Sequence, residues 1–535
     1  MIEMPKPQTA TPLPPDAAPT EKVEDKPSLK LEDRRSLELV IALVGPVASG
    51  VSTTGAIMAE ILEERFGYKV KTIKLSPLIK EYAGEVGEKI DDGLTGEKRI
   101  EKYQLVGNKL RNQKSKSFLV DCAIDKVAQF RVENGGFHIS KGSAPVPVQK
   151  RFAYIIDSLK NPAELERLRQ VYGDLLWVIT VFAPNKTRLS RLTDDGADEV
   201  AAQTVMRRDQ QDDESTGQQV SKTAHRADYF IRNHSDTRDR LKTSVNRFFD
   251  VIFEQELHTP TFEEKGMMKA AAAALQSACL SRQVGAAIYN RENELIGVGC
   301  NDVPKSGGGL YSEGDGEQDK RCFKWGGQIC HNDERKARLA RAIAKSVSDK
   351  SAENDNAETE APKFSFEQAL KAASQSDAKN LIEFSRSVHA EMEAIVSVAR
   401  EGKGATSGGV LFTTTYPCHN CARHIVAAGI KRVVYVEPYS KSLALDLHHD
   451  SISETDENGR VHFQQYEGFS PRTAMRVFST AGRDRKANGK IIESNPRVAI
   501  PLFPTPLDSY INTEGLVIQQ LSGDENHVEE KGASE

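Results

Sequence analysis

The sequence predicts an α/β protein with two domains, each built on a sheet that is packed against helices. Two observations support this expectation. An apolar run at 37–44 passes through a glycine-rich loop into a helical pattern at 54–66, which is typical of the start of a parallel sheet. Further along, the order helix, two strands, helix, strand, helix and strand between 267 and 436 predicts a layered domain with helices on its sheet.

The loop after the first predicted strand has the spacing of a phosphate-binding loop. Gly45, Gly50 and Ser52 occupy fixed positions of G-x-x-x-x-G-K-[ST], in which backbone amides and the hydroxyl, here followed by Thr53, hold phosphate and Mg²⁺. Val51 replaces the lysine and cannot donate to the β- and γ-phosphates. We therefore expect nucleotide binding without efficient phosphoryl transfer. An active kinase or hydrolase and an empty scaffold remain alternatives.

Two further predicted strands, 152–157 and 176–182, continue the N-terminal domain. The first ends in Asp157, the position of a magnesium-side aspartate. A group of arginines then precedes a short strand at 227–233, an order that resembles the lid and last strand of small-metabolite kinases such as dephospho-coenzyme A kinase over roughly 37–253. A solvated helical face is the other interpretation of the arginines. They are Arg188, Arg191, Arg207 and Arg208.

The most specific motif in the chain is His389-x-Glu391 followed by Pro-Cys418-x-x-Cys421. One histidine and two cysteines suit a tetrahedral zinc ion whose fourth position stays open for water. Helical periodicity places His389 and Glu391 in the first turn of a buried helix. Cys418 and Cys421 should start a second helix, where free amides favour the thiolate form that binds metal.

Glu391 is the candidate catalytic residue of this motif. The spacing is typical of zinc-dependent nucleobase deaminases, in which a glutamate that is not a ligand carries protons. Zinc lowers the pKa of the water that it binds. Glu391 would take a proton from this water and deliver it to the base, and it would later protonate the departing amine. A structural zinc site is the alternative, but such sites normally have four protein ligands and would give Glu391 no role. The motif alone leaves cytosine and adenine open.

Three stretches beside the motif look like the deoxycytidylate deaminase family, and the likeness covers about residues 262–470. The resemblance implies cytosine as the base, Asn301 as a contact to the sugar, and Arg282 as a lining residue of the substrate pocket. Where the family has Gly-Tyr-Asn-Gly, this chain has Gly-Cys-Asn-Asp, and a turn asparagine is the other interpretation of Asn301. The stretches are 281–286, 299–304 and 427–435.

The pairing of the two halves resembles the bacterial anti-phage dCTP deaminases over nearly the whole chain. The resemblance implies a P-loop kinase-like parallel-sheet domain at 37–253 and a cytidine-deaminase-like α/β/α domain at 258–480. It also implies conversion of dCTP and dCMP to uracil nucleotides, which would deplete a pool that a phage needs. The same resemblance implies that the protein forms a homo-oligomer and that an inhibitory antitoxin RNA binds it.

The remaining segments are expected to be tails or insertions. Residues 1–36 are rich in Pro, Lys, Glu and Thr and predict a disordered tail and not a signal peptide. Residues 481–535 are expected to form an extension and a disordered tail. An insertion at about 303–380 contains polar stretches at 305–318 and 346–362, which predict mobile parts and a regulatory role. Three side chains in it could bind a second zinc ion or be packing residues. They are Cys322, Cys330 and His331.

Composition narrows the function classes. The chain of 535 residues has a net charge of −5, with lysine and arginine dispersed among acids, and lacks the basic stripe expected of a polynucleotide-editing deaminase. Seven cysteines fit a reducing, cytoplasmic compartment, and no apolar run predicts a membrane span. Val51 disfavours a nucleotide kinase. We therefore expect zinc-dependent deamination of free deoxycytidine nucleotides.

Overall fold

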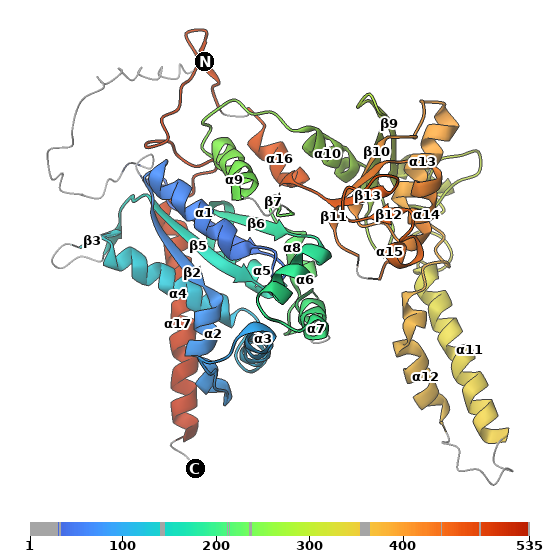
Figure 1. The fold of residues 1–535 in the computed structure, drawn as a ribbon, viewed down its shortest axis with the longest axis horizontal. Coiled ribbons are helices and arrows are strands. Elements are labelled where there is room, and N and C mark those ends of the chain that lie inside the picture. The colour runs from blue at the N-terminus through green and yellow to red at the C-terminus, as the bar shows by residue number, and fades with distance from the viewer. Residues whose placement is uncertain are drawn as a thin grey trace.

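The computed structural model describes residue 30 and residues 34–532, apart from seven short gaps. Figure 1 shows two bodies built on sheets, with a helical hairpin projecting from the second. No helix in the described part is both long and apolar enough to span a membrane. The gaps are 140–144, 211, 213–214, 235–237, 354–363, 440 and 481–482.

The first sheet has the strand order β14-β7-β6-β1-β5-β2. All its strands run parallel except β14, which pairs antiparallel with β7 at one edge. Every residue of β1 and β6 is buried, because helices cover both faces. This confirms the parallel-sheet fold predicted for the N-terminal half. The strands are β1 (Leu39–Val44), β2 (Lys69–Lys74), β5 (Phe152–Leu159), β6 (Leu176–Phe182), β7 (Tyr229–Arg232) and β14 (Gly468–Phe469).

The helices around this sheet are α1 (Val51–Glu64), α2 (Leu75–Glu81), α3 (Gly96–Gln113), α4 (Phe118–Glu133), α5 (Pro162–Tyr172), α6 (Asn185–Asp194), α7 (Glu199–Gln210), α8 (Val220–Ala224) and α9 (Arg238–Ile252).

Alternate residues of β1 face two separate cores. Leu39, Ile41 and Leu43 pack with α1 and α9, whereas the residues between them pack with α4 and α5. Short elements complete the domain: η2 (Ala83–Val86), η3 (Gly173–Leu175), β3 (Phe137–His138) and β4 (Val146–Pro147).

The second sheet has the order β12-β13-β11-β10-β8-β9. β8 pairs antiparallel with β9 and β10, and the strands from β10 to β12 are parallel. α10 packs on one face, and α13 and α14 pack on the other, which confirms the predicted layered α/β/α domain. Its elements are α10 (Phe262–Ala274), β8 (Gly285–Tyr289), β9 (Leu295–Cys300), α13 (Ala390–Glu401), β10 (Val410–Thr415), α14 (His419–Ala427), β11 (Arg432–Glu437), α15 (Ala444–Leu447), β12 (Ile452–Ser453) and β13 (Val461–Gln465).

The insertion forms a helical hairpin that projects from the second body (Figure 1). α11 (His331–Glu353) packs along α12 (Phe366–Gln375), and two short helices, η4 (Glu313–Gln318) and η6 (Asp377–Asn380), flank the pair. The polar stretch predicted at 346–362 is therefore helical as far as Glu353. Its remaining residues lie outside the described part.

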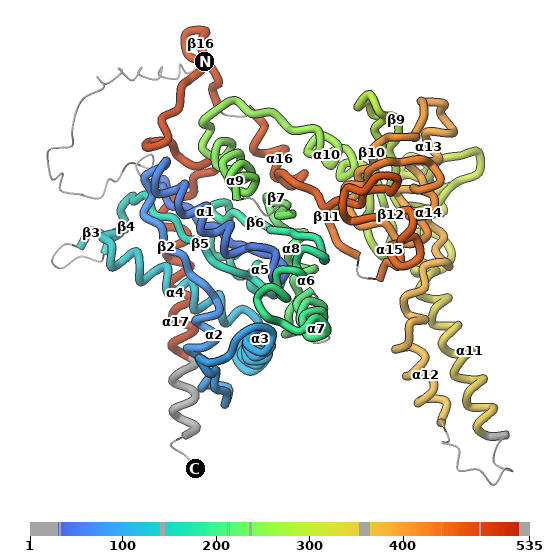
Figure 2. The backbone as a smooth tube through the Cα atoms, viewed as in Figure 1, coloured from blue at the N-terminus to red at the C-terminus, as the bar shows by residue number. Residues whose placement is uncertain are grey.

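The C-terminal segment returns to the first body, as Figure 2 shows. β14 joins the first sheet and α16 (Pro471–Val477) follows it, so the predicted domain boundary at 480 is wrong. The extension after it is also not simply a tail, because α17 (Leu507–Gly532) packs on α4. Long-range pairing of this kind leaves no local signal in the sequence. A small hairpin, β15 (Lys486–Ala487) with β16 (Lys490–Ile491), lies between them.

The predicted N-terminal tail, 1–36, lies mostly outside the described residues. Its last residues are fixed by α17. The Arg34 guanidinium pairs with Asp508, and the Ser36 and Tyr510 hydroxyls lie 2.9 Å apart. Disorder is therefore the wrong prediction for 34–36.

A buried charge cluster fastens α17 to the N-terminal domain. Arg131 on α4 donates to Glu38 through Nε and Nη2, both at 2.8 Å, and to Glu514 on α17. All three side chains are about 1% exposed, and Tyr510 adds a hydrogen bond to Glu38. Because these charges are shielded from water, their ion pairs with one another replace the lost hydration.

We expect Arg131→Met to destabilise the protein by about 3–5 kcal/mol, since it leaves two buried carboxylates without a partner. Lys242→Met removes an exposed pair with Glu60 and serves as the control, with little expected change. Urea unfolding followed by fluorescence measures both. Equal stability of the two variants would contradict this role of the cluster.

Candidate active site

Two helix starts bring the predicted metal ligands together. His389 is the N-cap of α13 and Cys418 is the N-cap of α14, with Cys421 in its first turn. The His389 Nδ1 atom lies 3.3 Å from the Cys418 sulfur and 3.4 Å from the Cys421 sulfur. All three donor atoms lie within 4.8 Å of one another. One nitrogen and two sulfurs at this separation fit a single zinc ion with an open position.

Local backbone contacts position these ligands. The amide of Cys421 donates to the Cys418 sulfur at 3.4 Å, which caps α14. Hydrogen bonds from Cys421 and then His389 lower the pKa of Cys418 and favour the thiolate. On the other helix, a Cβ at Gly299 would lie 2.4 Å from the Ala390 carbonyl oxygen. Only glycine lets β9 approach the start of α13 so closely.

Glu391 is buried beside the metal ligands without joining them. Glu391 is 4% exposed. Among the described residues, the group of donor atoms that could hold a metal ion comes from His389, Cys418 and Cys421 and does not include Glu391. The Cys421 thiol donates to its Oε2 atom at 3.4 Å. Burial raises the pKa of the Glu391 carboxyl above its ordinary value. A carboxyl positioned in a pocket can act as a general base and then as a general acid.

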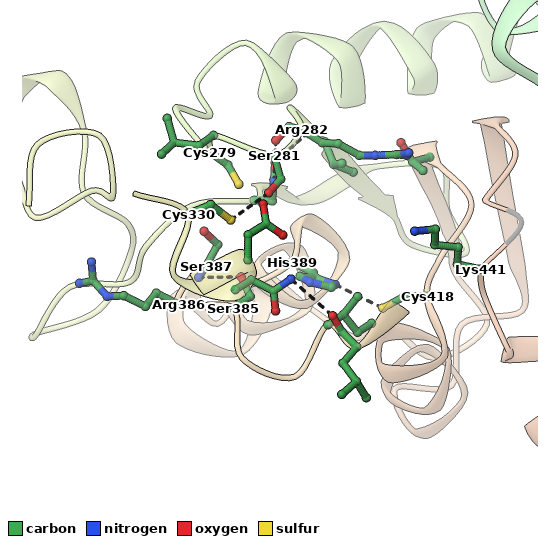
Figure 3. Close-up of a pocket in the computed structure, with 18 of the residues that line it drawn as sticks. Cys279, Ser281, Arg282, Cys330, Ser385, Arg386, Ser387, His389, Cys418 and Lys441 are labelled. Atoms are coloured by element: carbon green, nitrogen blue, oxygen red, sulfur yellow. Dashed lines mark hydrogen bonds between the residues drawn. The ribbon is translucent and has the colours of Figure 1, made fainter. Parts of the chain in front are cut away.

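A cavity of about 520 Å³ opens onto this centre and is lined by His389, Glu391 and Cys418. Figure 3 shows His389 and Cys418 on its wall. The two predicted substrate residues, Asn301 and Arg282, also line it. The volume lies within the range of small-molecule sites. The structure therefore brings the predicted metal, catalytic and substrate residues to one pocket.

Asn301 and Arg282 have different surroundings in this cavity. Both polar atoms of the Asn301 amide are used within the protein: Oδ1 accepts from the Val284 amide at 2.7 Å, and Nδ2 donates to the Arg282 carbonyl at 2.8 Å. Asn301 therefore fixes the loop that carries Arg282. The Arg282 side chain is half exposed, pairs with Glu437 at 3.2 Å and lies over the Tyr439 ring. Contact with substrate remains a prediction for both.

A group of cations around the cavity was not found from the sequence. Burial lowers the pKa of the Lys441 ammonium, and three neighbouring cations lower it further. Two of these three cations lie in the insertion. No motif or spacing in the sequence links the insertion to the residues after β11. The three cations are Lys336, Lys379 and Arg282.

The candidate second zinc site does not form a compact cluster. Among the described residues, only the His389 group brings three such donor atoms within 4.8 Å. The Cys330 sulfur lies 3.4 Å from the Ser281 hydroxyl, and Arg386 lies 3.9 Å from the Cys322 sulfur. These thiols are half-buried and, together with His331, line the same cavity.

Three residues of the N-terminal loop, Gly45, Gly50 and Ser52, make close contacts within the first domain. The Ser52 hydroxyl donates to Asp157 at 2.7 Å, which joins the two predicted magnesium-side residues. Gly50 caps α1 with a φ of 90°, and a Cβ there would lie 2.2 Å from Asn233. A Cβ on Gly45 would lie 2.6 Å from Val51. Thr53 is exposed on α1.

Polar side chains hold the carbonyls of this loop. Lys160 donates to the Gly45 carbonyl at 2.9 Å and pairs with Asp209, whose other oxygen accepts from the Val47 amide at 2.7 Å. Arg188 donates to the Val47 carbonyl at 2.8 Å and is 1% exposed. The solvated-face interpretation is therefore wrong for Arg188, and Lys160 brings to the loop an ammonium group that Val51 lacks.

Residues 260–437 match the family described as the cytidine and deoxycytidylate deaminase zinc-binding region. Over 55 residues the chain is 42% identical to the deoxycytidylate deaminase of Enterobacteria phage T2, a stretch that covers 10% of this chain and 29% of that protein. The chain thus spans about three tenths of the length of this relative.

Solved structures of a deaminase and of a kinase are among those that match parts of the chain. The dCMP deaminase from the cyanophage S-TIM5 in apo form is 16% identical, covers 39% of this chain and 99% of that chain, and has a TM-score of 0.20. The shikimate kinase from Bacteroides thetaiotaomicron is 12% identical, covers 40% of this chain and 97% of that chain, and has a TM-score of 0.23.

Proposed function

Because residues 260–437 form a cytidine and deoxycytidylate deaminase zinc-binding region, we propose that this protein deaminates free deoxycytidine nucleotides, dCMP and dCTP. One observation carries the proposal. Three side chains that could hold a zinc ion, His389, Cys418 and Cys421, lie together beside a cavity of about 520 Å³ that is also lined by the buried Glu391, which is outside that cluster. A structural zinc site would need a fourth protein ligand and would leave Glu391 without a role.

The side chains of this cavity support the reaction of cytosine and water to uracil and ammonia. His389, Cys418 and Cys421 would hold zinc, which supplies the Lewis acidity that makes water a nucleophile at neutral pH. Glu391 accepts a proton from the attacking water and delivers it to N3 of the base. It then transfers the second proton to the amine, which leaves from C4 as ammonia.

Cations at the cavity support a substrate that carries phosphate. Lys336, Lys379 and Lys441 line it together with Arg282, while Asp333 is the acid among them besides Glu391. Lys336 already pairs with Asp333 at 2.7 Å and Arg282 pairs with Glu437 at 3.2 Å, and an anion in the cavity would add a further partner for cations that repel one another. We propose that they hold the phosphates of the nucleotide.

We expect Lys336→Gln combined with Lys379→Gln to raise the KM for dCTP about tenfold, with a smaller effect on the KM for dCMP and on kcat. A tenfold change corresponds to about 1.4 kcal/mol for the two lysines together, less than two full charge-assisted hydrogen bonds, because solvent screens these partly exposed side chains. Lys371→Gln, on the exposed side of α12, is the matched control. Steady-state kinetics measures all three proteins. An unchanged KM for dCTP would contradict the phosphate role of these lysines.

A substrate panel tests the proposed base. Purified, zinc-loaded protein should convert dCMP and dCTP to dUMP and dUTP and leave dAMP and dATP unchanged, with chromatography to separate the products. Conversion of adenine nucleotides would instead indicate an adenine deaminase, because the same zinc chemistry can attack adenine.

The wider role that we propose rests on the resemblance to the anti-phage deaminases. A homo-oligomeric enzyme, held inactive in the cytoplasm by an inhibitory RNA, would lower dCTP and raise dUMP after its release. Nucleotide extracts from infected cells that carry the normal chain or Glu391→Ala test this. Equal dCTP in both would contradict it.

We also propose that the N-terminal loop binds a nucleotide with Mg²⁺ but transfers phosphate slowly. The Ser52–Asp157 hydrogen bond and the nearby Lys160 support binding, and Val51 argues against transfer. A phosphate-release assay with ATP and the full chain should show turnover near background. Rapid release would restore the kinase hypothesis.

A further inference from the structure

An acid from another part of the first domain holds the N-terminal loop, residues 45–53. Asp209 lies in the last turn of α7, and its side chain is 2% exposed. Its Oδ2 atom accepts a hydrogen bond from the Val47 amide at 2.7 Å. In loops with this spacing the backbone amides donate to phosphate oxygens. The Asp209 carboxylate therefore uses a donor that the loop would offer to a phosphate group.

The other carboxylate oxygen of Asp209 accepts from an ammonium group. Lys160 donates to Asp209 Oδ1 and to the Gly45 carbonyl, both at 2.9 Å. It directly follows β5, which pairs in parallel with β1, so the two strands end side by side and bring Lys160 to the start of the loop. The Val51 side chain, at the lysine position of the motif, packs into an apolar core instead. Lys160 therefore supplies an ammonium group to this loop, and Asp209 neutralises it.

A buried donor inside the loop has no acceptor. The Ser49 side chain is 0% exposed, and its hydroxyl has no hydrogen-bond partner among the described residues. A Cβ on Gly45 would lie 2.7 Å from this hydroxyl, which therefore points across the loop. The first amides of α1, from Val51 onward, also lack an acceptor within the helix. Because a buried donor without an acceptor costs free energy, these groups indicate a ligand with several acceptor oxygens.

α6 and α7 cover the loop. The side chains of Val47 and Ala48 pack against four buried residues of α6, α7 and the turn between them. Figure 1 shows these two helices side by side on the first body. This cluster is much smaller than the two cores beside the sheet, so the polar bonds of Asp209 are a substantial part of what holds α7 on the loop. The four residues are Leu192, Ala197, Ala202 and Met206.

We propose that Asp209 is a displaceable latch of the N-terminal loop. The phosphate of a nucleotide displaces this carboxylate, accepts from the Val47 amide and pairs with Lys160, which takes the place of the lysine that Val51 replaces. The latch rests on the proposed binding of a nucleotide with Mg²⁺ by this loop and restrains that binding. Because phosphate competes with a carboxylate of the same chain, the nucleotide binds only the fraction of molecules in which the latch is open.

Replacing Asp209 with asparagine tests the latch. Asparagine keeps the shape of the side chain and an oxygen for the Val47 amide but removes the charge that opposes phosphate. Calorimetry with MgATP on the full-length, zinc-loaded protein should show at least about tenfold tighter binding in Asp209→Asn than in the unmodified chain. Damage to the fold would weaken binding, so a gain has no merely structural explanation. Unchanged or weaker binding in a folded Asp209→Asn protein would overturn the latch.

Asp121→Asn is the matched control for this variant. Asp121 is also a buried acid of the first domain, but it pairs with Arg167 at 3.0 Å and accepts from the Ser117 hydroxyl, both outside the loop. Its replacement should leave the affinity for MgATP unchanged. Equal tightening in both variants would show that loss of any buried negative charge in this domain is sufficient, and would overturn the specific role of Asp209.

Two double variants test where the gain arises. Lys160→Met added to Asp209→Asn should remove the gain, since the freed ammonium group is the one that pairs with phosphate. A gain that survives this change would overturn the role of Lys160. Ser52→Ala added to Asp209→Asn should also weaken MgATP binding, because the Ser52 hydroxyl lies in the first turn of α1 beside Asp157. A gain that Ser52→Ala leaves intact would place the nucleotide outside the loop and overturn the proposal.

Hydrogen exchange measured by mass spectrometry follows the latch in the unmodified chain. On addition of MgATP, the amides at 45–53 should exchange more slowly and those at 199–210 faster, since a displaced Asp209 no longer fixes the end of α7. Protection of the loop without any change in α7 would overturn the latch and leave nucleotide binding by the loop in place. Protection of neither segment, with no MgATP binding in any variant, would refute the proposed function of the loop and the latch with it.

Discussion

Replacing Glu391 with alanine should abolish uracil formation while zinc stays bound. Glu391 is buried in the cavity but does not belong to the cluster of ligand atoms, so its loss removes the proton carrier and leaves three ligands in place. Positioned general acid–base groups contribute about 100- to 10,000-fold to rates, and here one group serves several proton transfers. We expect a loss of at least about 1,000-fold.

Zinc content and uracil formation should be measured on the same preparation. Glu393→Ala is the matched control, because Glu393 is a buried acid on the same helix that pairs with Arg400 and does not line the cavity. It should keep both zinc and activity. If Glu391→Ala lost zinc together with activity, Glu391 would be holding the site together and its proposed role would be wrong.

Replacing Cys421 with alanine should remove both zinc and activity. Its sulfur lies 3.4 Å from the His389 Nδ1 atom, and without it only two protein ligands remain for an ion that needs at least three. We expect the zinc content to fall from about one ion per chain to near zero. Metal analysis after gel filtration measures this directly.

Cys300 provides the control for the cysteine variant. It is also buried in the deaminase half, but its sulfur is not among the described ligand atoms. Cys300→Ala should keep zinc and activity. Zinc retention by Cys421→Ala would refute the proposed ligand set.

The metal centre could be predicted because its geometry is set locally. His389 and Cys418 each begin a helix, so short spacings along the chain determine where Glu391 and Cys421 point. The phosphate-loop pattern was informative for the same reason: Gly50 begins α1 and Ser52 lies in its first turn. The alternation of β1 residues between two cores likewise follows from a strand that lies between two helical layers.

Contacts between distant segments could not be predicted. Arg131 and Glu514 are 383 residues apart, and nothing near either residue indicates the other. The same holds for β14, which crosses back to pair with β7 after the whole deaminase sheet has formed.

For some polar side chains the sequence allows two interpretations, and only the tertiary structure shows which one holds. Arg188 and Arg208 lie on neighbouring helices, yet Arg188 is buried against the phosphate loop and Arg208 is exposed. Asn301 fits a turn as well as a substrate contact, and the structure shows it bonded to two backbone groups of its own domain.

The central claim is that the zinc pocket takes a free nucleotide. The most direct test compares dCTP with the same deoxycytidine inside a single-stranded oligonucleotide, at equal concentrations of cytosine and with the zinc-loaded protein. Chromatography of the digested products should show deoxyuridine from dCTP and none above background from the oligonucleotide. Faster conversion of the oligonucleotide cytosine would contradict the claim and favour a polynucleotide-editing enzyme.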